Sequence, residues 1–107
     1  MNLVSSDNKF VVFGSNGMAG SSICRALKKN GYTKILQPLR KELNLLNYSE
    51  VNEWFKLYKP EIVIIAAAKV GGIHANNHYP ADFILENLKI QNNIIEIAWK
   101  AKVSKLL

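Results

Sequence analysis

Short apolar stretches alternate along this chain with longer segments in which apolar residues recur every three or four positions. The apolar stretches predict strands at residues 9–14 and 61–67, shorter strands at 34–39 and 42–46, and the beginning of another strand at 103–107. Helical spacing predicts helices at residues 18–30, from Asn47 to Tyr58, and at 81–102. Strands that alternate with helices predict an α/β fold, and continuous apolar strands indicate a parallel sheet covered on both faces.

Residues at the boundaries of these segments support the predicted helices. Gly31 follows the first helix and accepts the left-handed conformation that commonly ends one. Asn47 is a predicted N-cap of the second helix, with Glu50 at the reciprocal position of a capping box, and Lys59-Pro60 ends that helix. The predicted apolar stripe of the third helix contains Ile84, Leu88, Ile95 and Ala98.

The first predicted strand leads directly into a glycine-rich turn, Gly14-Ser15-Asn16-Gly17-Met18-Ala19-Gly20. A glycine at such a turn accepts backbone angles that a Cβ forbids, a second permits close approach of a ligand, and a third lets the helix pack against the strand. The N–H groups at the start of the helix are then placed to bind a pyrophosphate. The alternative is a turn whose glycines serve packing alone. We interpret the segment as the phosphate-binding turn of a Rossmann-like, doubly wound parallel sheet.

A basic residue lies where a dinucleotide fold meets the adenosine ribose, roughly 20 residues after the last glycine of the turn. Arg40 occupies this place, at the end of the second predicted strand. A guanidinium suits bidentate contact with the 2′-phosphate of NADP, whereas an acidic residue would bind the 2′-hydroxyl of NAD. Glu42 is close by and leaves NAD open, and a solvated surface arginine is the simpler alternative. We favour the phosphate interpretation because the glycine turn is in register.

The strand at 61–67 runs into three small residues, Ala66, Ala67 and Ala68. Small residues at the carboxyl end of a central strand leave room for a ligand, or serve tight helix–sheet packing. The loop that follows contains His74 and His78, but it carries no carboxylate. We therefore predict no metal site there.

The composition limits the possible partners. Lys+Arg number 14 against 8 Asp+Glu, which gives a net charge of +6 that favours anionic ligands or simply maintains solubility. The lysines are not interleaved with aromatic residues, so we expect no nucleic-acid partner. No apolar run approaches the roughly 20 residues that span a bilayer, and residues 1–7 lack the features of a signal peptide. We therefore expect a cytoplasmic protein without a membrane partner. The single cysteine, Cys24, lies in a helical pattern and is interpreted as a core residue.

Three segments, Arg40–Leu46, Ala66–Ile73 and Asn76–Ile84, together resemble the GDP-L-fucose synthases. These are extended short-chain dehydrogenase/reductases of the NAD-dependent epimerase/dehydratase family. The resemblance extends from Lys9 to Leu107. The glycine turn alone would indicate only the superfamily, whereas the second and third segments are far more selective.

The resemblance implies an NADP(H)-dependent enzyme that epimerises two carbons of GDP-4-keto-6-deoxymannose and then reduces its keto group to give GDP-L-fucose. It implies that residues 14–20 hold the pyrophosphate and that Arg40 meets the 2′-phosphate. It further implies that Asn44 and Leu45 border the adenine, and that Ala66 to Ala68 line the path of the cofactor. The family's turn often reads Gly-His-Arg-Gly, whose arginine also assists the phosphate. Here Ser15-Asn16 stands in its place, so NADP preference rests more heavily on Arg40.

The resemblance covers about the first third of such an enzyme. The family's catalytic Ser, Tyr and Lys, and its epimerising Cys and His, follow the fifth strand, where this chain ends. We therefore expect residues 1–107 to be the N-terminal part of a dinucleotide-binding domain, with about four strands and three helices, without a substrate domain and inactive alone. The complete enzyme would bind a GDP-sugar and form a homodimer through the helix at 81–102. The alternatives are a non-catalytic dinucleotide-binding module and a fragment of another NAD(P)-dependent nucleotide-sugar epimerase/dehydratase.

Overall fold

The computed structural model describes residues 7–15, 17–66 and 80–107, and it forms one parallel sheet flanked by helices. The elements in chain order are β1 (Phe10–Phe13), α1 (Met18–Lys29), β2 (Ile35–Leu36), α2 (Tyr48–Tyr58), β3 (Ile62–Ile65), α3 (Pro80–Lys100) and β4 (Lys105–Leu106). The strands are ordered β2-β1-β3-β4, and every neighbouring pair is parallel. The predicted Rossmann-like α/β fold is thereby confirmed.

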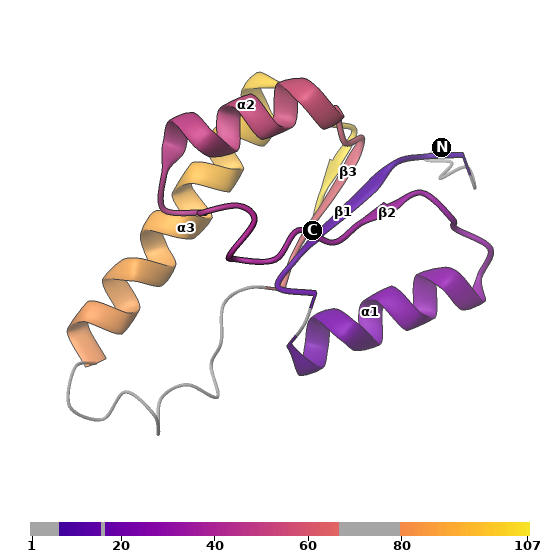
Figure 1. Ribbon diagram of the computed structural model, residues 1–107, viewed down its shortest axis with the longest axis horizontal. Coiled ribbons are helices and arrows are strands. Elements are labelled where there is room, and N and C mark those ends of the chain that lie inside the picture. Colours follow the sequence, from indigo (N-terminus) through magenta and orange to yellow (C-terminus); the bar gives the residue numbers. More distant parts are fainter. Residues whose placement is uncertain (1–6, 16, 67–79) are drawn as a thin grey trace.

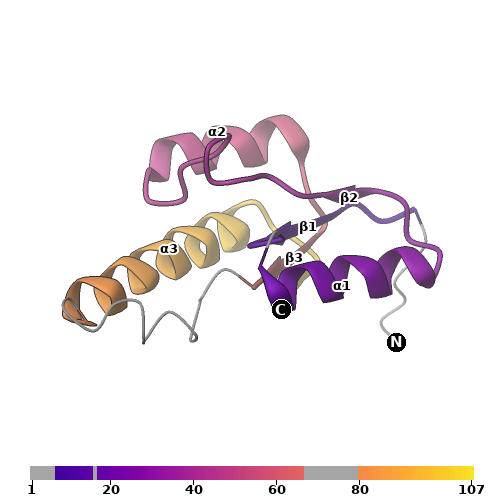
Figure 2. The same cartoon turned by 60° about the horizontal axis from the view of Figure 1, so that its bottom comes forward.

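The sheet separates two apolar cores because β1 and β3 are covered on both faces. Figures 1 and 2 show α1 on one face and α2 with α3 on the other. Val11 and Phe13 of β1 join the core beneath α2 and α3, where Ile94 and Ile97 are fully buried. Phe10 and Val12 contribute to the core beneath α1. The continuous apolar strands of the sequence therefore reflect a three-layer arrangement.

The strand predicted at 42–46 is wrong. The segment forms two turns, in which the N–H groups of Glu42 and Leu43 donate to the Leu39 carbonyl and that of Asn47 donates to the Asn44 carbonyl. Leu43 and Leu45 are nevertheless buried, against α2 and α3. Their alternation resembles that of a strand because two successive turns point both leucines into the same core. The final predicted strand does form, as β4 beside β3.

The helix boundaries agree with most of the sequence signals. Gly31 adopts a positive φ of 92° after α1, as predicted. Asn47 caps α2, and its side chain accepts a hydrogen bond from the Glu50 N–H at 3.1 Å. The reciprocal half of the capping box is absent, because the Glu50 carboxylate accepts from the Asn44 N–H at 3.0 Å instead. Lys59 ends α2 in the left-handed conformation immediately before Pro60.

The long helix α3 directs a different face into the core from the one predicted. Ile90, Ile94, Ile97 and Ala98 are buried. Of the predicted stripe, Ala98 is confirmed, Leu88 and Ile95 are 50% and 45% exposed, and the side chain of Ile84 lies outside the described residues. Within the described ranges, neither α3 nor any shorter helix combines the length and hydrophobicity needed to cross a membrane.

Candidate functional site

The turn between β1 and α1 lies at the carboxyl edge of the sheet and contains the first group of predicted site residues. Gly14 has a positive φ of 84°, a conformation that favours glycine. Its carbonyl accepts a hydrogen bond from the Gly17 N–H at 3.1 Å, which closes the turn. Ser15 is buried within it, at 7% exposure, and Asn16 lies outside the described residues.

Gly20 allows α1 to pack directly on this turn. A Cβ at Gly20 would overlap the Gly14 carbonyl oxygen and would lie 2.7 Å from its carbon and 2.9 Å from Ser15 Cα. These distances are shorter than real Cβ contacts, so no larger residue fits without a shift of backbone. The third glycine therefore has the close-packing role that the sequence predicts.

The start of α1 has the properties of an anion-binding helix terminus. The first intrahelical hydrogen bond runs from the Ser21 N–H to the Gly17 carbonyl, so the N–H groups of Met18, Ala19 and Gly20 precede the helical ladder. No side chain caps this end, and its first turn has no acidic residue. Met18 is 90% exposed and Ala19 is also exposed. Backbone N–H groups and the positive end of the helix dipole there favour a phosphate.

The second group of predicted residues follows β2. Arg40 is exposed, and it lines a hollow of about 40 Å³ together with Asn44, Leu45, Leu46 and Ile90. The structure thus brings together Arg40 and the two residues predicted to border the adenine. The Asn44 side chain accepts a hydrogen bond from the Leu46 N–H at 3.1 Å, while Leu45 is buried.

Helix α3 contributes two residues that the sequence analysis did not select. Glu86 places a carboxylate oxygen 3.9 Å from an Arg40 guanidinium nitrogen. The Asn93 side chain donates a hydrogen bond to the Leu45 carbonyl at 2.9 Å. Glu42, the acid nearest to Arg40 in the sequence, instead accepts from the Leu39 N–H at 2.8 Å. No local pattern indicates Glu86 or Asn93, because both contacts join segments far apart in the chain.

The remaining predicted positions lie at the end of β3. The Ala66 N–H donates to the Phe13 carbonyl at 2.8 Å, so Ala66 continues the pairing with β1 next to the Gly14 turn. Ala67 and Ala68 lie outside the described residues, as do His74 and His78. Among the residues that the structure does describe, no group of three or more His, Cys, Asp and Glu side chains is placed to hold a metal ion.

Cys24 has the environment of a core residue, as predicted. It is 5% exposed and lies in the core beneath α1. Burial raises the pKa of its thiol, and nearby Lys28 only partly opposes this. A raised pKa reduces the thiolate population and with it the nucleophilicity of the side chain.

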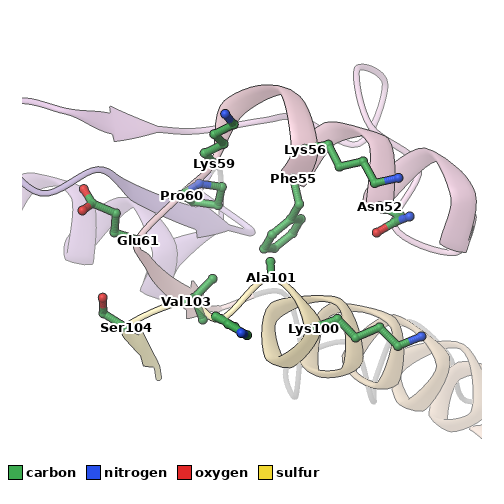
Figure 3. A pocket seen from close by; sticks show the side chains of 11 residues that line it. Asn52, Phe55, Lys56, Lys59, Pro60, Glu61, Lys100, Ala101, Val103 and Ser104 are labelled. Carbon is green, nitrogen blue, oxygen red and sulfur yellow. The ribbon is translucent and has the colours of Figure 1, made fainter.

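A second hollow lies at the opposite, amino edge of the sheet and contains none of the predicted site residues. It has a volume of about 740 Å³ and is bordered by the C-terminal ends of α2 and α3. Figure 3 shows Phe55 pointing toward Ala101, with the side chains of Lys56 and Lys100 extending in the same direction. Lys100 is paired with Glu96 at 3.1 Å, and Lys56 lies 3.6 Å from Glu53. Because this hollow contains none of the predicted site residues, we take the glycine turn together with the Arg40–Leu45 segment as the candidate site.

Comparison with known proteins agrees with this placement. The sequence pattern of the NAD dependent epimerase/dehydratase family matches residues 10–107. GDP-L-fucose synthase 1 of Arabidopsis thaliana is 50% identical over 99 residues, which make up 92% of this chain and 31% of that protein. GDP-L-fucose synthase of Escherichia coli (strain K12) is 45% identical, over 95% of this chain and 32% of that protein. The chain thus spans about a third of the length of these curated relatives.

The solved structures show the same relationship in three dimensions. A GDP-D-glycero-L-gluco-heptose synthase from Campylobacter jejuni, solved in the presence of NADPH, has a TM-score of 0.90 and 38% identity. The match covers 97% of this chain and 30% of that one. The family resemblance read from the sequence is therefore confirmed, and this chain belongs to the NAD dependent epimerase/dehydratase family.

Proposed function

We propose that the chain is the N-terminal, NADP(H)-binding portion of an enzyme of the GDP-L-fucose synthase type. The observation that carries the proposal is the 50% identity to a GDP-L-fucose synthase over 92% of the chain. The close packing of Gly20 on Gly14 and the uncapped start of α1 support it. Gly20 lets the start of α1 pack directly on the Gly14 turn, and the uncapped helix start presents backbone N–H groups to an anion.

Each site residue predicted from the sequence has a place in this proposal. The pyrophosphate would be held by Gly14, Ser15, Asn16, Gly17, Met18, Ala19 and Gly20. Arg40 would bind the 2′-phosphate, Asn44 and Leu45 would border the adenine, and Ala66, Ala67 and Ala68 would line the path toward the nicotinamide. The bound cofactor would supply a hydride to a keto group of a GDP-sugar. This chain would contribute binding and orientation, and the reaction would belong to a longer protein that carries it.

Cofactor titration tests this proposal. With a longer protein that carries this chain, NADPH should give a saturable rise in nicotinamide fluorescence. Arg40→Asp in that protein should weaken NADPH far more than NADH, because it replaces a phosphate partner with a repelling charge. Arg25→Asp is the matched control, since Arg25 is exposed on α1 and contacts only the Ser22 hydroxyl among the hydrogen bonds described. Equal losses for both cofactors, or the same effect from Arg25→Asp, would exclude Arg40 as the discriminating residue.

A different GDP-sugar is the second candidate substrate. The 0.90 TM-score to a GDP-D-glycero-L-gluco-heptose synthase favours it. The names of that protein and of the fucose synthases both specify a GDP-linked sugar, but the sugars differ. Assaying a longer protein that carries this chain with GDP-4-keto-6-deoxymannose and with 4-keto GDP-heptoses would distinguish the two. Turnover of the heptose alone would contradict the fucose assignment.

We also propose that the complete protein forms a homodimer through α3. The outer face of this helix exposes large apolar side chains, Leu85, Leu88, Ile95 and Trp99. Trp99→Lys should shift the sedimentation coefficient toward that of the monomer, whereas Leu57→Lys, on the exposed face of α2, should not. Leu57 is a fair control because it is 73% exposed, close to the 76% of Trp99. A wild-type protein that stays monomeric at high concentration would refute the dimer.

A further inference from the structure

The acidic residue that faces Arg40 comes from α3 rather than from the neighbouring sequence. A Glu86 carboxylate oxygen lies 3.9 Å from an Arg40 nitrogen, and both side chains are more than half exposed, at 51% and 62%. Glu42 cannot fill this role while its carboxylate accepts from the Leu39 N–H. Glu86 is thus the carboxylate that the structure places beside the guanidinium.

The fold holds the segments that carry the two charges next to one another. The Asn93 side chain, about two helical turns beyond Glu86, bonds the Leu45 carbonyl at 2.9 Å. Between them, Ile90 is buried and lines the same hollow as Arg40. One face of α3 therefore contacts the Arg40–Leu45 segment at successive turns, so the segment cannot move away from Glu86 without breaking these contacts.

We propose that Glu86 is a specificity-determining residue that lowers the preference of the site for a 2′-phosphorylated dinucleotide. The inference rests on the proposed function, in which Arg40 binds the 2′-phosphate. A phosphate at Arg40 would compete with the Glu86 carboxylate for the guanidinium, and the two anions would repel one another. A 2′-hydroxyl carries no charge and can donate a hydrogen bond to a carboxylate. Glu86 therefore disfavours NADP(H) relative to NAD(H).

Charge substitution at position 86 tests the inference through binding alone. Dissociation constants for NADPH and NADH are measured by nicotinamide fluorescence in a longer protein that carries this chain, for wild type, Glu86→Gln and Glu86→Lys. Exposed ion pairs of this kind change binding by about two- to fivefold, so Glu86→Gln should raise the ratio of NADPH to NADH affinity by about that factor. Glu86→Lys should raise it further, and the effect should shrink at high salt because the groups are exposed.

Glu53→Gln is the matched control for net charge. This substitution also removes one negative charge, on the exposed face of α2, where Glu53 pairs with Lys56 and lies outside the candidate site. An unchanged or lower affinity ratio in both Glu86 variants, or an equal rise with Glu53→Gln, would overturn the role of Glu86 while wild-type NADPH binding left the proposed function intact. A longer protein that carries this chain but shows no saturable binding of NADPH would instead overturn the proposed function, and the role of Glu86 with it.

Discussion

Replacing Gly20 by alanine tests the contact on which the candidate phosphate cradle depends. The added Cβ would overlap the Gly14 carbonyl oxygen and approach the Gly14 carbon at 2.7 Å, whereas ordinary contact begins at 3.4 Å. The atoms that it meets belong to backbone, so a side-chain rotation cannot relieve the clash. Either α1 must move away from β1 or the Gly14 turn must open.

Two opposing effects set the expected magnitude. Alanine favours a helix over glycine by about 0.5–1 kcal/mol. Forcing an extra methyl group into a closely packed site costs about 1–3 kcal/mol. The clash should win, and Gly20→Ala should destabilise the fold by about 0.5–2 kcal/mol. The sign of the change therefore decides between a packing role for Gly20 and an ordinary helical position.

Urea unfolding followed by circular dichroism measures this difference. Gly31→Ala is the matched control, because a Cβ at Gly31 has nothing within 4 Å and meets only the cost of a positive φ, about 1–2 kcal/mol. Gly20→Ala should also weaken NADPH binding, since the turn moves, whereas Gly31→Ala should leave it unchanged. A Gly20→Ala chain as stable as wild type, or more stable, would refute the packing argument.

Two further predictions concern titratable groups. The Lys9 N–H donates to the Glu61 carboxylate at 2.8 Å and, as the largest cause, lowers the pKa of Glu61 below its usual 4.5. The ionised Glu61 carboxylate therefore stabilises the fold above pH 4.5, and this contribution is lost as the pH falls below that value. Glu61→Gln should be less stable than wild type at pH 7, and the difference in stability should vanish in acid. Unfolding followed by circular dichroism at each pH measures it. An equal difference at pH 3 and pH 7 would contradict this linkage. Cys24 should react with a thiol reagent about tenfold or more slowly in the native chain than in urea, because burial raises the pKa of its thiol. Equal rates would show that the thiol is accessible.

Local sequence patterns predicted most elements but not the segment at 42–46. Continuous apolar runs identified β1 and β3 because these strands are covered on both faces. The alternation of Leu43 and Leu45 indicated a strand, yet the backbone bonds there are local turns. Side-chain burial and backbone conformation are separate properties, and periodicity reports only the first.

The candidate site was predictable where its residues are contiguous. Residues 14–20 carry their own signal, since the glycine spacing reflects the packing of Gly20 against Gly14. The contacts of Glu86 with Arg40 and of Asn93 with Leu45 carry none, because they depend on how α3 returns across the sheet. The stripe predicted on α3 failed for a related reason, since two of its faces carry apolar residues and only packing shows which is buried.

The double covering of β1 and β3 has a consequence for how the sheet finds its alignment. Sliding one strand by a residue exchanges apolar side chains for apolar side chains on both faces, so the strand interiors do not define the register. A side-chain contact at the amino end contributes to it, because the Glu61 carboxylate accepts a hydrogen bond from the Lys9 N–H at 2.8 Å. Deleting one residue of β1 would shift Gly14 by about 3.3 Å along the sheet without depriving either core of hydrophobic residues. A contact before the strands begin thus helps to set where the Gly14 turn lies after they end.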